Sequence, residues 1–387
     1  MTGGIRDETA GFARALTASY ASIRRTIPRM GTARPSIGEA GGLTYIRCNE
    51  NDWVDSFWCG QLWLAWDETG DDAFFAAARA QRPYFAARLA RPESHNHDLG
   101  FLYCLSTLAD YRLTGDAEAR ALSLRAADAL AGRFNRAGNF IPAWNAPAGA
   151  PAAESRRRRG KIIIDCMMNL GLLFWAARET GWDELAAIAV AHADTNTRYI
   201  IRPDGSTYHT YDFDPDTGAP LGGFTAQGFA DESCWSRGHA WAIHGYTQTY
   251  RHTGEARFLD TARELADWSL AHLPVDGVPL WDYRLTPDAT PYRDSSAGAI
   301  EAAGLLLLAQ TLGDDPAAAA RYRASAERIL IALLDGYTTF AEAEAEGLLL
   351  HGASHVARGR ADTMLPYGDY FFVEALLRAG GRDRFFW

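Results

Sequence analysis

The sequence predicts an all-α protein, a single domain over residues 1–387 in which six helical hairpins close into an (α/α)6 barrel. The first observation behind this prediction is a recurring pattern of a helical segment, then Thr-Gly, then an acidic residue, then an Ala-rich segment. Repeats of this kind are typical of stacked supersecondary units. The copies occupy residues 64–81, 110–130, 174–193 and 249–270, with a degenerate copy at 307–330 that has Leu312 in place of Thr.

The second observation is the chemistry of each copy, which favours a helix hairpin. Glycine readily adopts the left-handed conformation that ends an α-helix. The acidic residue that follows stabilises the amino-terminal end of the next helix. Apolar residues in 122–134 and 258–270 recur every three or four positions, which is the period of an α-helix.

The third observation is that the two ends of the chain complete the count. The five copies supply five hairpins, and a sixth can be assembled from residues 12–27 and 369–380, both of which read as helices. Pairing of the two ends would close the ring. On the pattern alone, an open solenoid is the alternative arrangement.

Composition limits the class of ligand. The chain carries 38 Lys and Arg against 48 Asp and Glu, a formal net charge of −10. This acidic balance argues against a nucleic-acid partner, which needs a basic face for phosphates. It is compatible with a small acidic ligand, because a few well-placed arginines reverse the charge locally. The basic run at 156–160 reads most simply as a solvated loop.

The cysteines and the hydropathy indicate where the protein resides. The five cysteines are scattered and form no CxxC pair, which favours a reducing compartment over a disulfide framework. No segment has the features of a signal peptide or the length of a bilayer span. We therefore expect a cytoplasmic protein with no membrane partner.

Long segments rich in aromatic residues and glycine separate the predicted hairpins. Loops of this length in a compact domain are commonly functional. They lie at residues 41–62, 91–103, 134–161, 202–239 and 274–298.

The segment HNHDLGF (95–101) places Asp98 directly before a predicted amphipathic helix, on the loop side. A metal site using His95, His97 and Asp98 is one interpretation, since HxH is a known ligand spacing, but no further cluster supports it. A helix cap is the structural role open to Asp98. The functional alternative is that Asp98 is one of two reactive carboxylates.

Asp165 follows three isoleucines and opens another apolar helix. An aspartate in such surroundings is costly unless it is paired or protonated. Burial raises the pKa of a carboxyl, which suits a general acid near neutral pH. Asp98 and Asp165, each opening a helix on the same loop face, resemble the paired carboxylates of sugar-cleaving enzymes. A helix cap is again the structural alternative.

The segment 224–246 offers Gln227, Trp235, Arg237 and Trp241 as ligand-binding residues. A guanidinium between two indoles suits a planar anionic sugar, because it forks onto a carboxylate while the rings pack against the sugar. Core packing of the two tryptophans is the alternative.

Motifs for cofactors are absent from the sequence. It contains neither of the Gly-rich phosphate-binding motifs, GxGxxG and GxxxxGK[ST], and it also lacks the GxSxG motif of a serine nucleophile. We therefore expect neither a cofactor nor a bound metal.

At these residues the sequence resembles the unsaturated glucuronyl hydrolases, glycoside hydrolase family 88. The resemblance runs over nearly the whole chain and implies an (α/α)6 barrel, in agreement with the hairpin count. Its most specific parts are HDLGF (97–101), IIIDCMMNLGLLFWA (162–176), RPDGSTYH (202–209), AQGFADESCWSRGHAW (226–241) and RDSSA (293–297).

The resemblance implies a hydrolase acting on unsaturated uronate-containing oligosaccharides, such as glycosaminoglycan fragments left by polysaccharide lyases. Such enzymes remove the non-reducing-end 4-deoxy-hex-4-enuronate by acid-catalysed hydration of its C4=C5 vinyl ether. Asp165 matches the general acid/base, and Asp98 matches the second carboxylate. The residues expected to bind substrate are Trp53, Trp144, His192, Gln227, Trp235, Arg237, Trp241 and Ser354.

The chain departs from the family pattern at several positions, and these leave alternatives open. Ala226 and His239 stand where the family often has His and Gln, which leaves the contacts around the substrate carboxylate open. Leu350 and Ala357 replace expected cations, so a preference for sulfated substrates stays open, with Arg358 as a substitute. The alternative functions are an unsaturated rhamnogalacturonyl hydrolase of the family 105 kind, a non-catalytic carbohydrate-binding toroid, and a sugar epimerase with paired histidine bases.

Overall fold

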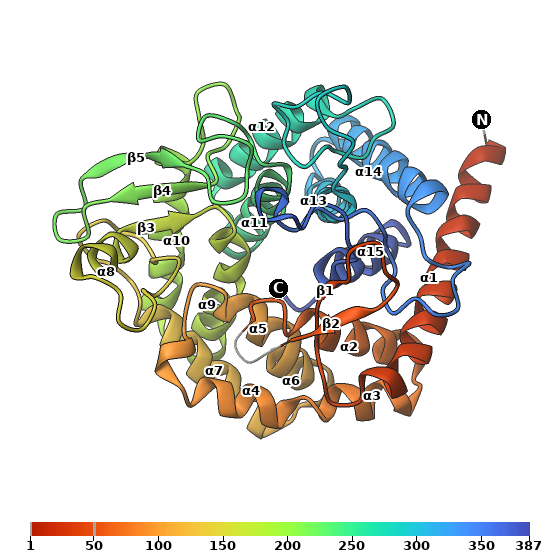
Figure 1. The fold of residues 1–387 in the computed structure, drawn as a ribbon, viewed down its shortest axis with the longest axis horizontal. Coiled ribbons are helices and arrows are strands. Elements are labelled where there is room, and N and C mark those ends of the chain that lie inside the picture. Colours follow the sequence, from red (N-terminus) through yellow and green to blue (C-terminus); the bar gives the residue numbers. More distant parts are fainter. Residues whose placement is uncertain (1, 49–51) are drawn as a thin grey trace. The chain divides into compact units, whose positions relative to one another are not determined.

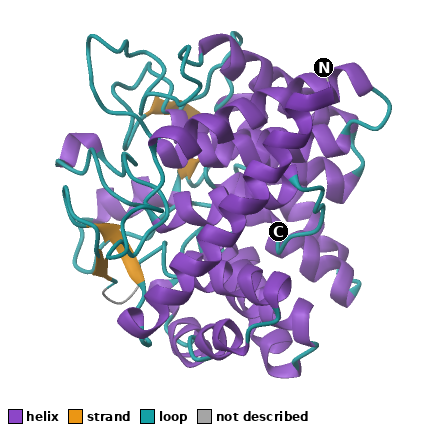
Figure 2. Ribbon diagram, turned by 90° about the vertical axis from the view of Figure 1, so that its right-hand side faces the viewer, coloured by secondary structure: helices purple, strands orange, loops and turns teal. Residues whose placement is uncertain are grey.

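The computed structural model describes residues 2–48 and 52–387, and helices dominate this part of the chain (Figure 1, Figure 2). The helices are α1 (Thr2–Met30), α2 (Phe57–Thr69), α3 (Asp72–Arg79), α4 (Arg82–Leu89), α5 (Leu99–Tyr103), α6 (Ala109–Thr114), α7 (Ala117–Ala131), α8 (Ala152–Arg159), α9 (Cys166–Thr180), α10 (Asp183–Tyr199), α11 (Ser236–Thr253), α12 (Ala256–His272), α13 (Ser295–Thr311), α14 (Pro316–Gly336) and α15 (Pro366–Ala379). Short helical turns are η1 (Pro92–Ser94), η2 (Cys104–Leu108) and η3 (Val356–Arg358). The strands are β1 (Pro35–Gly38), β2 (Tyr45–Arg47), β3 (Lys161–Ile163), β4 (Thr210–Phe213) and β5 (Pro220–Phe224).

The Thr-Gly pattern forms helix ends, as predicted. The glycine is the residue after the helix and has a φ between 68° and 73° in all four full copies, at Gly70, Gly115, Gly181 and Gly254. The threonine also has a role that the pattern did not reveal. Its hydroxyl donates to the carbonyl four residues earlier and accepts the backbone N–H two residues later, in all four copies.

Residue contacts group the chain into two compact units. Unit 1 comprises residues 1–81 and 270–385, and unit 2 comprises residues 82–269 and 386–387. A single domain over residues 1–387 stays a prediction.

In unit 1, α13 packs against α14 and α15, and α15 also contacts α1 and α2 (Figure 1). Residues 295–308 of α13 are all buried, as expected for a helix that is apolar on every side and surrounded by protein. The contact of α1 with α15 confirms the predicted pairing of the two ends of the chain.

In unit 2, α9 contacts α5, α7, α10 and α11, and residues 166–177 are buried throughout. Its approach to α5 is so close that a Cβ on Gly100 would lie 2.3 Å from the Cα of Asn169. A side chain at position 100 would therefore push the two helices apart. This contact lies at the amino-terminal ends of both helices, next to Asp98 and Asp165.

A three-stranded antiparallel sheet, β3–β4–β5, leads into the start of α9 (Figure 1). The register pairs Ile163 with Thr210, and the Ile164 N–H donates to the His209 carbonyl at 3.0 Å. The isoleucine run is therefore a strand that delivers Asp165 to the helix start. The same pairing brings His209 beside Asp165.

Two further properties concern the whole of the described chain. All five cysteines are free thiols, four of them buried and Cys48 half-buried. Within residues 2–48 and 52–387, no helix combines the length and apolar character needed to cross a membrane.

Candidate active site

Asp98 and Asp165 occupy the residue before α5 and the residue before α9, as predicted from the sequence. Neither side chain accepts a capping hydrogen bond from the helix that follows. Four other aspartates in the same position do accept such bonds, namely Asp71, Asp116, Asp294 and Asp315. Capping therefore does not account for the carboxylates of Asp98 and Asp165.

Asn169 joins the two helix starts that carry these carboxylates. Its Oδ1 accepts the Phe101 N–H at 2.6 Å, and its Nδ2 donates to the Asp165 carbonyl at 3.2 Å. The side chain is fully buried. Together with the close contact at Gly100, this bridge fixes the backbone of Asp165 against the first turn of α5.

The Asp165 carboxyl lies in a desolvated place. Its side chain is 9% exposed, and its Oδ2 is buried without a hydrogen-bond donor among the described residues. Burial raises the pKa of Asp165 to about 7, against the opposing pull of the Arg237 charge. A carboxyl with this pKa retains its proton in a large fraction of molecules at neutral pH, which is what a general acid requires.

His209 is held in one orientation beside Asp165. Its Nδ1 faces the backbone N–H groups of Ala226 and Gln227, both at 3.1 Å, so Nδ1 acts as the acceptor. In a neutral ring the proton then sits on Nε2. This Nε2 lies 3.8 Å from Asp165 Oδ2, so His209 presents a donor toward the reacting end of the site.

Arg237 completes the same cluster from the first turn of α11. It is 1% exposed, and its guanidinium lies 4.4 Å from the centre of the Trp235 ring. Its Nη2 donates to Gln227 Oε1 at 3.0 Å. The ring of His209 packs on Trp235 at 4.2 Å. The arrangement combines a cation, an amide and a ring N–H, which together suit a carboxylate-bearing sugar.

The surroundings of Asp98 include a neutral histidine and an arginine. His97 Nε2 lies 3.3 Å from Asp98 Oδ1. Burial, assisted by the charge of Arg133, holds the pKa of His97 well below its usual value, so the ring is neutral at physiological pH. The Trp144 ring meets the His97 ring edge-on at 6.2 Å.

Four of the predicted binding residues have other surroundings. The His192 ring is fully buried, with Nδ1 bonded to the Ile141 N–H at 2.9 Å and Nε2 2.8 Å from Asn196 Nδ2. Trp241 is fully buried, and its ring lies 5.1 Å from that of Phe101. Trp53 and Ser354 belong to unit 1.

The two unit 1 residues differ in their packing. The Trp53 ring is stacked on Tyr367 at 4.8 Å. Ser354 is half-buried and follows Ala353, whose N–H donates to the capping carboxylate of Asp294 at 3.3 Å. Both stay predictions as substrate-binding residues.

The metal interpretation of His95, His97 and Asp98 gains no support. His95 Nε2 is 3.0 Å from the Leu89 carbonyl. Among the described residues, no group of three or more His, Cys, Asp or Glu side chains is arranged to hold a metal ion.

His209 and Asn169 are members of this cluster that sequence reasoning did not select. Both lay inside segments that were identified, RPDGSTYH and IIIDCMMNL. No sequence signal singles out His209, because the β3–β4 register that places it opposite Ile164 is a long-range property. Asn169 stood out only as a polar residue in an apolar helix.

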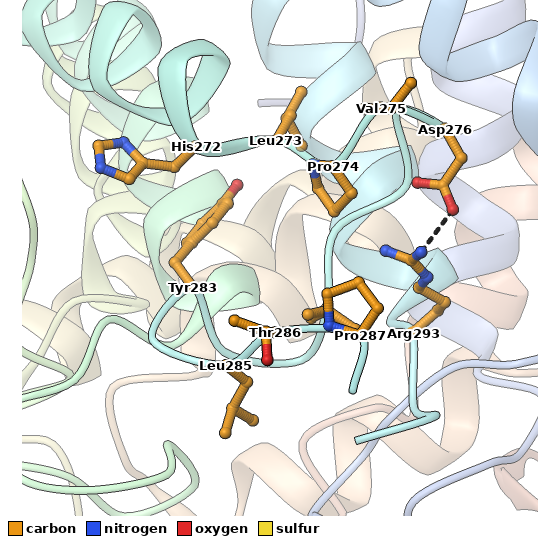
Figure 3. Close-up of a pocket in the computed structure, with 11 residues that line it drawn as sticks. His272, Leu273, Pro274, Val275, Asp276, Tyr283, Leu285, Thr286, Pro287 and Arg293 are labelled. Atoms are coloured by element: carbon orange, nitrogen blue, oxygen red, sulfur yellow. Dashed lines mark ion pairs between the residues drawn. The ribbon is translucent and has the colours of Figure 1, made fainter. Parts of the chain in front are cut away.

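A separate cavity of about 580 Å³ lies within unit 1, between the end of α12 and the start of α13 (Figure 3). Its wall is largely apolar, and an Arg293–Asp276 ion pair at 2.5 Å closes one side. None of the predicted site residues lines it. The candidate active site is therefore the Asp98–Asp165 cluster of unit 2.

Comparison with known proteins identifies the family of the chain. The model of Glycosyl Hydrolase Family 88 matches residues 39–360. An unsaturated glucuronyl hydrolase of Bacillus sp. (strain GL1) is 40% identical over 356 residues, which cover 92% of this chain and 93% of that protein. An unsaturated chondroitin disaccharide hydrolase of Streptococcus pyogenes serotype M1 is 38% identical over 336 residues, 86% of this chain and 82% of that protein.

The solved structures give the fold. The crystal structure of the unsaturated glucuronyl hydrolase from Bacillus sp. GL1 matches with a TM-score of 0.91 and 38% identity, covering 97% of this chain and 99% of that chain. This match confirms the predicted all-α fold class, the (α/α)6 barrel. With the family model spanning most of its length, the chain belongs to glycosyl hydrolase family 88.

Proposed function

We propose that the protein is a hydrolase that removes a 4-deoxy-hex-4-enuronate from the non-reducing end of oligosaccharides made by polysaccharide lyases. Glycosaminoglycan fragments are the substrate class that we favour. The names of the two relatives, an unsaturated glucuronyl hydrolase and an unsaturated chondroitin disaccharide hydrolase, support this function over the rhamnogalacturonan and binding-protein alternatives. The free, scattered cysteines support a cytoplasmic location.

The observation that carries the proposal is the state of Asp165. Its pKa of about 7 supplies a proton near neutral pH, and its Oδ2 has no competing hydrogen-bond donor among the described residues. A structural aspartate at a helix start would use its oxygens on the helix amides, as Asp294 does. Asp165 keeps a desolvated carboxyl at an energetic cost, which is typical of a catalytic group.

The chemistry follows from a protonated acid beside a vinyl ether. Asp165 gives its proton to C4, the C4=C5 double bond is consumed, and positive charge shared with the ring oxygen develops at C5. Water adds at C5 and returns a proton to the Asp165 carboxylate. The resulting hemiketal opens to a ketone at C5, which leaves a hemiacetal at C1 that releases the neighbouring sugar as an alcohol. One water is consumed, and the acid is regenerated.

We assign the other residues of the cluster to positioning the substrate and the attacking water. We assign Arg237 and Gln227 to the C6 carboxylate, since a bonded guanidinium and amide offer donors in fixed directions. We assign Asp98 to the sugar hydroxyls, with His97 at 3.3 Å restricting its rotation. His209 donates from Nε2 to the carboxylate or to the attacking water, because its Nδ1 is already occupied as an acceptor.

The test is hydrolysis of an unsaturated chondroitin or hyaluronan disaccharide, followed by loss of the ultraviolet absorbance of the double bond. Mass spectrometry should show the addition of one water and two monosaccharide products. Asp194→Asn is a matched control, because Asp194 is a half-exposed residue of unit 2 paired with Arg257. Absence of turnover on several lyase products would contradict the function, and full activity in Asp165→Asn would contradict the mechanism.

A further inference from the structure

We propose that a cavity of unit 2, next to Trp144, binds an oxyanion carried by a sugar beyond the unsaturated uronate, either a sulfate or a carboxylate. This inference rests on the proposed function. The cavity has a volume of about 520 Å³, within the usual range for ligand sites. The residues that carry the argument are Arg133, Trp144, Ser155, Arg158 and Arg159.

The charge of the cavity wall favours an anion. Three arginines line it, and no Asp or Glu does. Arg158 bonds to Glu154 at 2.6 Å with both side chains partly exposed, and Arg159 is 66% exposed and 4.0 Å from Asp216. Exposed ion pairs of this kind contribute little free energy. Both guanidiniums can therefore turn to a ligand oxyanion at small cost.

The arginines of the basic run at 156–160 have different partners, and only two of them line the cavity. The run is helical, in α8, where the sequence favoured a solvated loop. Arg156 bonds to Asp214 and Asp216, and Arg157 bonds to Asp212 at 2.8 Å. Neither lines the cavity, whereas their neighbours Arg158 and Arg159 do. Arg156 and Arg157 hold the β4–β5 hairpin, whereas Arg158 and Arg159 line the cavity, with Arg159 still 4.0 Å from Asp216.

The remaining wall suits a sugar. Trp144, Phe134 and Pro142 supply flat apolar surfaces, and Ser155 supplies a hydroxyl. Rings of this kind pack against sugar C–H faces, while guanidiniums bind sulfate or carboxylate with two parallel hydrogen bonds. A purely apolar ligand would offer these cations no hydrogen-bond acceptor, which disfavours it.

The cavity is joined to the active site through a rigid segment. Trp144 contacts His97, which lies 3.3 Å from Asp98. Arg133 donates to the His95 carbonyl at 2.8 Å and to the Pro142 carbonyl at 3.0 Å, so it ties the wall of the cavity to the segment before Asp98. A saccharide whose first ring is bound near Asp98 would direct its later rings past Trp144.

The test compares three unsaturated tetrasaccharides: one from chondroitin sulfate, one from hyaluronan, and one whose sugars after the uronate are uncharged. In Arg158→Gln/Arg159→Gln, we expect kcat/KM for a charged tetrasaccharide to fall about tenfold relative to the uncharged one. A fall for chondroitin sulfate alone identifies sulfate, and a fall for both charged substrates identifies the carboxylate. Arg156→Gln is the matched control from the same run.

Two results would overturn the proposal: an unchanged ratio in the double variant, or the same fall in Arg156→Gln. Calorimetry on Asp165→Asn measures binding of the charged tetrasaccharides with and without the two arginines, so it needs no turnover. If the protein hydrolyses no unsaturated saccharide yet this binding depends on Arg158 and Arg159, the proposed function fails and the cavity stands as an anion site. If hydrolysis occurs without that dependence, only the cavity proposal fails.

Discussion

Unit 1 and unit 2 each contain a buried aspartate whose pKa burial raises to about 7, Asp369 and Asp165. Asp369 uses both of its oxygens: Oδ2 accepts the Tyr45 hydroxyl at 2.6 Å, and Oδ1 accepts the Leu349 N–H at 3.0 Å. It thereby joins α15 to two other segments of unit 1. Asp165 Oδ2 accepts no such bond, and a histidine Nε2 stands 3.8 Å away.

The difference shows that a raised pKa does not by itself identify a catalytic acid. Desolvation acts on any buried carboxyl, and structural aspartates experience it as strongly as reactive ones. What separates the two is the use of the oxygen atoms. The structural carboxyl is committed to donors of its own unit, whereas Asp165 has an oxygen still to be engaged and donors of Arg237 and His209 nearby. Four predictions test this difference between the two aspartates.

The largest expected effect is the loss of activity in Asp165→Asn. An amide cannot protonate C4, so kcat should fall by about 10²–10⁴-fold. The same change should stabilise the protein at alkaline pH. Folding raises the pKa of Asp165 from 3.8 to about 7, so the folded protein binds this proton more tightly than the unfolded chain. That contribution is complete below about pH 4 and is lost as the pH rises through about 7.

Urea unfolding of both proteins at several pH values measures the second effect. Asn does not titrate, so the stability of Asp165→Asn relative to the parent should increase between pH 4 and 7, by at most about 4 kcal/mol. A difference that stays constant over this range would contradict the desolvated state of Asp165.

The next effect concerns Asn169, which holds the backbone of Asp165. Asn169→Ala removes the acceptor of the Phe101 N–H and the bond to the Asp165 carbonyl. Small displacements of a catalytic group are costly, so kcat should fall by about 10²-fold, and the alkaline limb of the pH–rate profile should move. Steady-state kinetics over pH is the measurement.

A matched control for Asn169 is Thr107→Val in the same unit. The Thr107 hydroxyl is 2.7 Å from that of Ser123, a buried polar contact between η2 and α7. This variant should lose stability but keep the pH–rate profile of the parent. If Asn169→Ala behaved in the same way, Asn169 would be only a packing residue.

The next prediction concerns the stability of a pair of leucine variants and tests the structural role of Asp369 directly. Asp369→Leu leaves the Tyr45 hydroxyl and the Leu349 amide buried without their acceptor, so it should lower the free energy of unfolding by about 2–5 kcal/mol. Asp165→Leu removes no hydrogen-bonded oxygen at Oδ2 and should be tolerated far better. Thermal unfolding of the two variants at pH 6 decides the question, and equal destabilisation would erase the contrast between the two aspartates.

Local chemistry explains how much of this was predictable from the sequence. The Thr-Gly turns and the positions of Asp98 and Asp165 before two helices follow from short-range preferences, and the structure has them. The pairing of α1 with α15 followed instead from the count of repeats, which left the two ends to complete the ring. His209 depended instead on a strand register, which no local pattern specifies. The His192 ring is bonded to Ile141 and Asn196, and the sequence did not predict these contacts. A histidine on a helix face gives no sign of what lies opposite it.

The smallest effect concerns the charge of Arg237, the feature of the Asp165 surroundings that opposes burial. Its cation favours the ionised carboxylate, so Arg237→Gln should raise the pKa of Asp165. Because the protonated form is the active one, the alkaline limb of kcat/KM should move to higher pH, by about one unit. The absolute kcat/KM should fall as well, since we assign Arg237 to the substrate carboxylate. Arg136→Gln, an exposed pair with Glu184 in unit 2, is the control that should leave the limb in place. A limb that moved to lower pH in Arg237→Gln would mean that a group other than Asp165 donates the proton.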